Sequence, residues 1–91
     1  MKIIWTRHAE ERLRQWNLKL GITRQEVEEI LTNPDQVVLS AYDVLIAQSK
    51  RGNGLLRIPY KTLNGIRKVL TLYRTSKIVK YGREKKDEDK I

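Results

Sequence analysis

Apolar residues recur at helical spacing in the first third of the chain and at alternating spacing in the rest. Between Arg7 and about Lys19 they fall at three- and four-residue steps, the spacing of one helix face, at Ala9, Leu13, Trp16 and Leu20. Thr6 is a suitable N-cap for this helix, and Gly21 fits the left-handed position that ends one. The pattern therefore predicts a first helix over about 7–19.

A second helix is predicted directly after the first. Thr23 and Glu26 have the spacing of a capping box, in which each residue satisfies a free backbone donor of the other. The apolar positions expected to face inward are Val27, Ile30 and Leu31. Pro34 ends this helix, because a proline biases the preceding residue, here Asn33, away from helical angles.

From Gln36 onward the apolar period shortens to that of strands. Four short segments are rich in Val, Leu, Ile and Tyr and are separated by turn sequences: VVLSA, VLIAQSK, LLRIPY and KVLTLYR. Four consecutive strands joined by tight turns predict an antiparallel meander. The sequence thus predicts an α+β domain with two N-terminal helices packed on one face of a four-stranded antiparallel sheet.

Alternation assigns the side chains of the last two predicted strands to faces. It places Arg57 and Lys61 opposite the apolar residues of their strand, and it places Arg74 opposite Tyr73 in the next. With the helices on one face, we expect Arg57 and Arg74, with Lys61 near them, to project from the other. Pro59 has no backbone N–H to donate, so we expect an edge or a bulge at this residue.

Length and composition limit the number of domains and the kinds of chemistry. A chain of 91 residues with 40% apolar content buries one core, so we expect a single domain over 1–81 and a flexible mixed-charge tail over 82–91. The absence of cysteine excludes disulfides and Cys-based metal sites, and with a single histidine we expect neither a metal site nor a cofactor. No apolar run approaches the ~20 residues that cross a bilayer, and no signal peptide is recognisable, so we expect a cytoplasmic protein.

The net charge of +8 is concentrated in one part of the chain. Between Asp43 and Glu84 there is no acidic residue and there are ten basic ones: Lys50, Arg51, Arg57, Lys61, Arg67, Lys68, Arg74, Lys77, Lys80 and Arg83. Such a run attracts polyanions, and nucleic acid is the commonest of these in a cytoplasm. The alternative is a protein that is basic for solubility alone.

The single histidine suggests a chemistry for this basic protein. His8 and Arg12 lie on one side of the first helix. RNA can be cut without a metal when a base removes the 2′-hydroxyl proton, cations stabilise the pentavalent phosphate and an acid protonates the leaving oxygen. His8 could be the base or the acid, and arginines, here Arg12, Arg57 and Arg74, suit the phosphate oxygens. The second proton carrier would then be another kind of residue, with Tyr73 and Tyr81 as candidates.

Two longer stretches resemble the domain-of-unknown-function family numbered 4258. The first, TRHAEERLRQWNLKLGITRQEVEEIL followed by NPD, has a His-Ala pair, a downstream Arg, a Gly-Ile-Thr linker and an Asn-Pro. The second, LLRIPYK with RKVLTLYRTSKIVKY, is similar to the closing pattern of that family. The resemblance covers about residues 4–81. It carries the functional positions of the family over to His8, Arg12, Tyr73, Thr75, Lys77 and Tyr81.

That family is similar to the RelE-like and barnase/EndoU/colicin-type ribonuclease fold, which implies a two-helix, four-strand domain and suggests a toxin of a toxin–antitoxin system. The first hypothesis is therefore a metal-independent endoribonuclease with four catalytic residues, His8, Arg12, Tyr73 and Lys77. Its nucleic-acid-binding residues would be Arg51, Arg57, Lys61, Arg74 and Tyr81.

The partners expected from this hypothesis are RNA and an antitoxin protein with an acidic segment, without a membrane. The oligomeric state stays open. The alternatives are a nucleic-acid-binding or regulatory module of the same fold without turnover, and a protein whose charge reflects only its environment.

Overall fold

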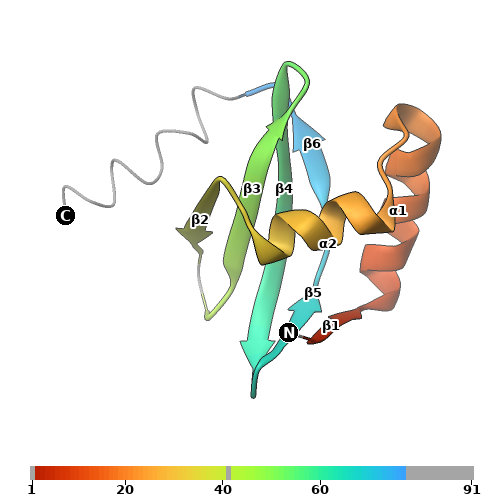
Figure 1. Ribbon diagram of the computed structural model, residues 1–91. Helices are drawn as coiled ribbons and strands as arrows, with labels where there is room; N and C mark the ends of the chain where they lie inside the picture. Colours follow the sequence, from red (N-terminus) through yellow and green to blue (C-terminus); the bar gives the residue numbers. More distant parts are fainter. Residues whose placement is uncertain (1, 41, 78–91) are drawn as a thin grey trace, which may run out of the picture.

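The computed structural model describes residues 2–40 and 42–77, which form two helices and a six-stranded sheet (Figure 1). In chain order the elements are β1 (Lys2–Trp5), α1 (Arg7–Leu20), α2 (Arg24–Thr32), β2 (Gln36–Leu39), β3 (Leu45–Arg51), β4 (Gly54–Leu63), β5 (Ile66–Val69) and β6 (Tyr73–Thr75). The predicted α+β class is confirmed, but the sheet has six strands instead of four. The predicted tail, 82–91, and Tyr81 lie outside the described residues.

Both helices begin and end at the residues that the sequence indicates. The Thr6 hydroxyl accepts a hydrogen bond from the Ala9 N–H at 3.0 Å, and Gly21 ends α1 with φ of 70°. The Thr23 hydroxyl accepts from the Glu26 N–H at 3.1 Å and so begins α2. These local caps explain why α1 and α2 were predictable from short stretches of sequence.

The first strand was not predicted, because its partner lies far away in the sequence. The strands follow the order β1-β5-β4-β3-β2, with β6 also paired to β4. β1 is the parallel member of the sheet: Lys2 lies opposite Ile66, and Trp5 lies opposite Val69. A run of four residues such as KIIW carries little periodicity of its own, so only the pairing with β5 identifies it as a strand.

A bulge divides the predicted fourth strand into β5 and β6. Tyr60 pairs with Val69, and Arg57 pairs with Tyr73, so the three residues 70–72 lie opposite the two residues 58–59. One extra residue reverses the alternation of side chains beyond the bulge. Tyr73 therefore shares a face with Arg57, and the predicted placement of Arg74 beside Arg57 is wrong.

Pro59 accounts for the position of the bulge. Its carbonyl oxygen accepts a hydrogen bond from the Leu70 N–H at 2.9 Å. Because the N and the O of an extended residue point to the same side, the nitrogen of Pro59 also faces β5 and β6, where a ladder bond is lost. Pro59 thus lies at a bulge, as one of the two predicted alternatives required, although β4 is the central strand and not an edge.

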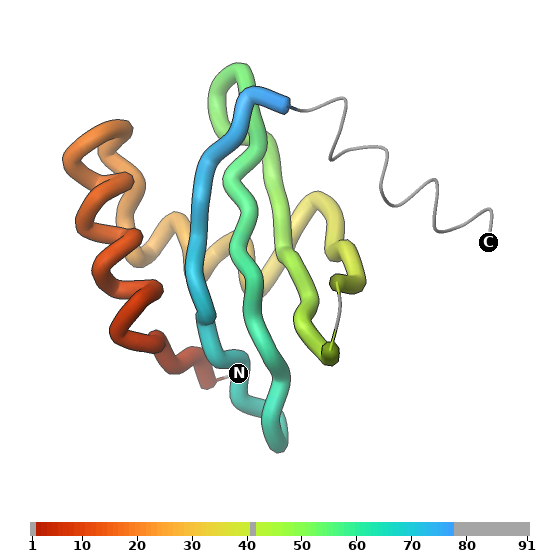
Figure 2. The backbone as a smooth tube through the Cα atoms, turned by 180° about the vertical axis from the view of Figure 1, so that it is seen from behind, coloured from red at the N-terminus to blue at the C-terminus, as the bar shows by residue number. Residues whose placement is uncertain are grey.

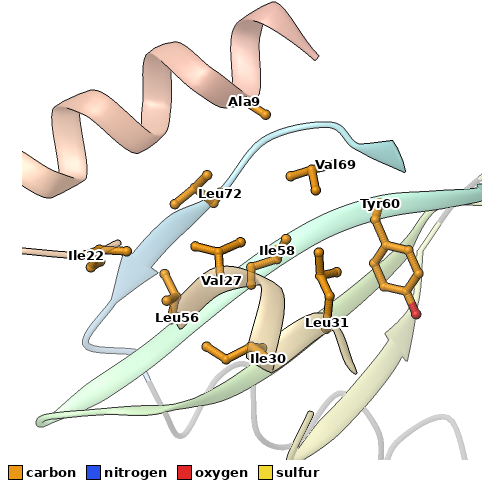
Figure 3. Packing of buried hydrophobic residues seen from close by; sticks show 11 residues of the cluster. Ala9, Ile22, Val27, Ile30, Leu31, Leu56, Ile58, Tyr60, Val69 and Leu72 are labelled. Atoms are coloured by element: carbon orange, nitrogen blue, oxygen red, sulfur yellow. The ribbon is translucent and has the colours of Figure 1, made fainter. Parts of the chain in front are cut away.

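The hydrophobic core lies between the sheet and the two helices (Figure 3). The buried apolar residues of this cluster are Ala9, Ile22, Val27, Ile30, Leu31, Ala47, Leu56, Ile58, Tyr60, Val69 and Leu72. All inward positions predicted for α2 are confirmed, whereas Leu20 at the end of α1 is 39% exposed. Both helices thus cover the same face of the sheet. On the opposite face, which we call the open face, residues 2–40 and 42–77 place no helix (Figure 2).

Gly54 is required where β4 and β6 approach each other. A Cβ at this position would overlap the carbonyl oxygen of Thr75 and press on the Arg74 guanidinium. We expect Gly54→Ala to lower the free energy of unfolding by about 2–3 kcal/mol in urea denaturation, as overpacking does. Gly65→Ala is the matched control: φ is +79° there, but the space is open, so about 1 kcal/mol is expected. Equal losses in the two variants would contradict the steric role of Gly54.

Candidate active site

Four side chains form a hydrogen-bonded row across the open face, which we call the polar row. Gln36, Gln48, Arg57 and Tyr73 come from β2, β3, β4 and β6 and are paired in register. Gln48 Nε2 donates to Gln36 Oε1 at 2.7 Å, and Arg57 Nε donates to Gln48 Oε1 at 2.8 Å. The Arg57 guanidinium also donates to the Tyr73 hydroxyl at 2.8 Å. The sheet register thus aligns a cation and a phenol oxygen.

The prediction that Arg57 projects from the open face is wrong, because its side chain is buried there. It is 2% exposed, and Gln48 beside it is 1% exposed. A buried charge is costly unless hydrogen bonds compensate for lost water, which explains why Gln48 and Tyr73 are placed on either side of it. Because Gln48 donates to Gln36 and accepts from Arg57, its amide orientation is fixed as well. The row therefore holds the Arg57 charge in one place below the surface.

His8 and Arg12 are exposed on α1. Glu10 forms an ion pair with Arg24 of α2, so His8 and Arg12, by helix geometry, lie on the flank of α1 that faces away from α2. The hydrogen bond described for Arg12 runs to Gln15 Oε1 at 3.3 Å. Both predicted residues are accessible to a ligand, as a catalytic role requires.

The start of α1 is attached to the strand that leads to Tyr73. The Thr6 N–H donates to the Val69 carbonyl oxygen, and the Thr6 hydroxyl donates to that of Leu70, each at 3.1 Å. His8 follows two residues later and Tyr73 three residues after Leu70. The structure thus brings His8 and Tyr73 to neighbouring elements. The hydrogen bonds described for Tyr73 and Arg57 join them to residues of the sheet and not to α1.

The remaining predicted residues fall in different environments. Lys61 lies half-buried on the open face, and Lys77 is exposed just beyond β6, where its N–H donates to the Thr75 hydroxyl at 3.1 Å. Arg51 lies on the helix side, with Nε donating to Glu26 Oε2 at 2.6 Å and a terminal nitrogen to the Leu20 carbonyl at 3.0 Å. Arg74 pairs with Leu56 and is therefore also on the helix side.

Gln36 and Gln48 are the residues of the polar row that sequence reasoning missed, and Gln48 is the buried one. It occurs within VLIAQSK, where an amide interrupts an apolar strand, and a buried polar side chain in a strand needs a partner. That signal was available, but the identity of the partner depends on the pairing of β3 with β4.

The charged side chains separate between the two layers of the fold. The six strands contain no Asp or Glu and carry eight cations: Lys2, Lys50, Arg51, Arg57, Lys61, Arg67, Lys68 and Arg74. The carboxylates of the described residues belong to the helices, except for Asp35 and Asp43 beside β2. The sheet is therefore the positively charged layer.

We searched the described residues for a cluster of metal ligands and for a membrane-spanning helix. They contain no group of three or more His, Cys, Asp or Glu side chains placed to hold a metal ion. Among them there is also no helix that is long and apolar enough to span a bilayer. A groove along α2, lined by residues that include Glu28, Glu29 and Thr32, contains none of the predicted catalytic residues.

The fold is similar to that of a ribonuclease toxin of known structure. The chain resembles the crystal structure of BrnT, a ribonuclease toxin of Brucella abortus, with a TM-score of 0.58 and 21% sequence identity, over 85% of this chain and 99% of that one. No protein-family model and no curated protein matches the sequence. The expected likeness to a ribonuclease-toxin fold is thus confirmed, and the resemblance to the family numbered 4258 stays a prediction.

Removal of Gln48 tests the polar row. In Gln48→Leu the Arg57 Nε–H loses a buried acceptor, so we expect the free energy of unfolding to fall by about 2–3 kcal/mol. Gln36→Leu, which leaves the Gln48–Arg57 bond in place, should cost about 1 kcal/mol. Urea unfolding of both variants measures the difference, and equal, small losses would show that the row does not hold the Arg57 charge.

Proposed function

We propose that this protein is a small metal-independent endoribonuclease of the toxin type, which cuts RNA by attack of the 2′-hydroxyl. The observation that carries the proposal is the hydrogen bond of 2.8 Å from Arg57 to the Tyr73 hydroxyl, on the open face of a cationic sheet. The shared fold with a ribonuclease toxin supports the same class of function. A phenol oxygen that accepts a hydrogen bond from a cation donates its own proton more readily.

The proposed reaction assigns each candidate residue a step. His8 removes the 2′-hydroxyl proton, and the 2′-oxygen attacks the phosphorus. Tyr73 gives its proton to the 5′-oxygen as the phosphorus–oxygen bond breaks, which leaves a 2′,3′-cyclic phosphate and a 5′-hydroxyl. Arg12 and Lys77, both exposed, neutralise the phosphate oxygens. Arg57 contributes a fixed positive charge from beneath Tyr73.

In this assignment Arg51 and Arg74 stabilise the fold and do not contact RNA. The Arg51 guanidinium links β3 to both helices through Glu26 and the Leu20 carbonyl. Arg74 lies against Gly54 and Gly52 at the turn between β3 and β4. Among the predicted nucleic-acid-binding residues, Lys61 is the described one whose position on the open face best suits RNA.

A toxin of this kind needs a partner protein that inhibits it. We propose an antitoxin whose acidic segment covers the open face, because that face presents cations without carboxylates among its strands. Such a partner would compete with RNA for the same charges.

A non-catalytic RNA-binding module is the second candidate. It is favoured because the hydrogen bonds described for the polar row do not include His8. Such a module needs the sheet cations but not His8 or the Tyr73 hydroxyl.

Cleavage of a mixed-sequence RNA in the presence of a chelator tests the proposed function. The parent protein should release fragments that end in 2′,3′-cyclic phosphate. Since a general acid or base contributes roughly 10²–10⁴-fold, His8→Ala and Tyr73→Phe should each slow cleavage by at least about 100-fold. Arg12→Ala should slow it as well, by weakening the contact with the phosphate.

Arg14→Ala is the matched control on the same helix, since Arg14 is exposed and lies outside the proposed site. It should cleave at the parental rate. Binding of RNA by the parent without any cleavage, with and without ribosomes, would favour the second candidate and overturn the catalytic assignment.

A further inference from the structure

Two lysines face each other across β4 and β5 on the open face. Lys61 pairs in register with Lys68, and Lys61 lies on the same side of β4 as Arg57. Directly opposite residues of an antiparallel pair have Cβ atoms about 4.5–5.5 Å apart, and like charges in this arrangement destabilise a sheet. The two ammonium groups therefore repel each other in the folded protein, and replacement of either lysine by a neutral residue would remove this repulsion.

The described part of the chain provides no carboxylate to compensate this pair. The ion pairs there, Arg24 with Glu10 and Arg51 with Glu26, both lie on the helix side. Neither Lys61 nor Lys68 takes part in a described hydrogen bond or ion pair. Lys68 is flanked on its other side by Ile4, and Lys2 lies on the same face of β1. The pair and Lys2 thus form a cluster of three cations, which we call the lysine cluster.

The lysine cluster is separate from the polar row. Lys61 lies four residues beyond Arg57 along β4, which corresponds to about 13 Å in an extended strand. Arg57 is also buried and hydrogen-bonded to Gln48 and Tyr73, so its guanidinium is not extended toward Lys61. A single RNA strand bound at Tyr73 of β6 can continue along β4 toward the turn between β4 and β5, so that a later phosphate reaches Lys61.

We propose that the lysine cluster, Lys2, Lys61 and Lys68, is a second phosphate-binding subsite, which holds the RNA backbone away from the point of cleavage. This inference rests on the proposed function for the nature of the ligand, and it adds a place where the strand is held. Backbone phosphates, unlike base edges, carry no sequence information, so the subsite binds RNA of any sequence. Neutralisation by RNA also relieves the repulsion between Lys61 and Lys68.

The test uses the full chain with the double variant Lys61→Gln/Lys68→Gln and a short 2′-O-methyl RNA, which binds but has no 2′-hydroxyl to attack. Fluorescence anisotropy over a range of salt concentrations measures the affinity. Loss of two phosphate contacts should weaken binding roughly tenfold at low salt and reduce the slope of log K against log salt by about 1.4. The loss should be the same for uridine-rich and adenosine-rich strands.

Thermal unfolding of the same double variant gives a readout that general damage to the fold would not give. Removal of the like-charge pair should raise the melting temperature, and Lys68→Glu, which places opposite charges across the strands, should raise it further while weakening RNA binding. A lower melting temperature in the double variant would overturn the argument from repulsion.

The matched control is Arg7→Gln/Arg14→Gln, which removes the same charge from exposed positions on the solvent side of α1. It should retain the parental affinity within about twofold. If the control loses as much affinity as the lysine variant, net charge explains binding and the subsite is refuted. If the parent and the lysine variant bind RNA equally well, the subsite is refuted while the proposed function stands. A parent that binds no RNA overturns both the proposed function and the subsite.

Discussion

A single extra residue in the pairing of β4 with β5 and β6 is the constraint on which the rest of this structure depends. Pro59 cannot donate to the ladder on that side, and residues 70–72 bulge opposite it. The bulge brings both Val69 and Leu72 to the helix side, where they are fully buried. It also brings Tyr73 to the open face, in register with Arg57. The core and the candidate site therefore follow from the same irregularity.

The bulge also positions α1. Thr6 caps this helix with its hydroxyl oxygen and, at the same time, hydrogen-bonds the carbonyls of Val69 and Leu70 at the edge of the bulge. A helix cap is a local device, but here the capping residue also anchors the helix to a distant strand. His8, two residues after Thr6, consequently lies near the segment that leads to Tyr73. A strand within the sheet and a helix attached at its first turn hold the two candidate residues, His8 and Tyr73, on neighbouring elements.

The open face carries positive charge in two different environments. Arg57 is buried, and its neighbours Gln48 and Tyr73 compensate for the lost water, so that its charge acts at a fixed point. Lys61 and Lys68 are partly exposed on flexible side chains, which suits contacts with a mobile backbone of phosphates. The first arrangement holds one charge at a fixed point, and the second presents two charges on flexible side chains.

Local chemistry in the sequence determined the helices, their caps, the α+β class and the cationic second half, because each depends on residues a few positions apart. The caps at Thr6 and Thr23 and the inward face of α2 are examples. Only the tertiary structure decided that KIIW is a strand, that Arg74 turns toward the helices, and that Gln48 supports Arg57. These depend on which strands pair and in which register. A one-residue bulge leaves the local pattern of apolar residues almost unchanged while it exchanges the two faces of the sheet.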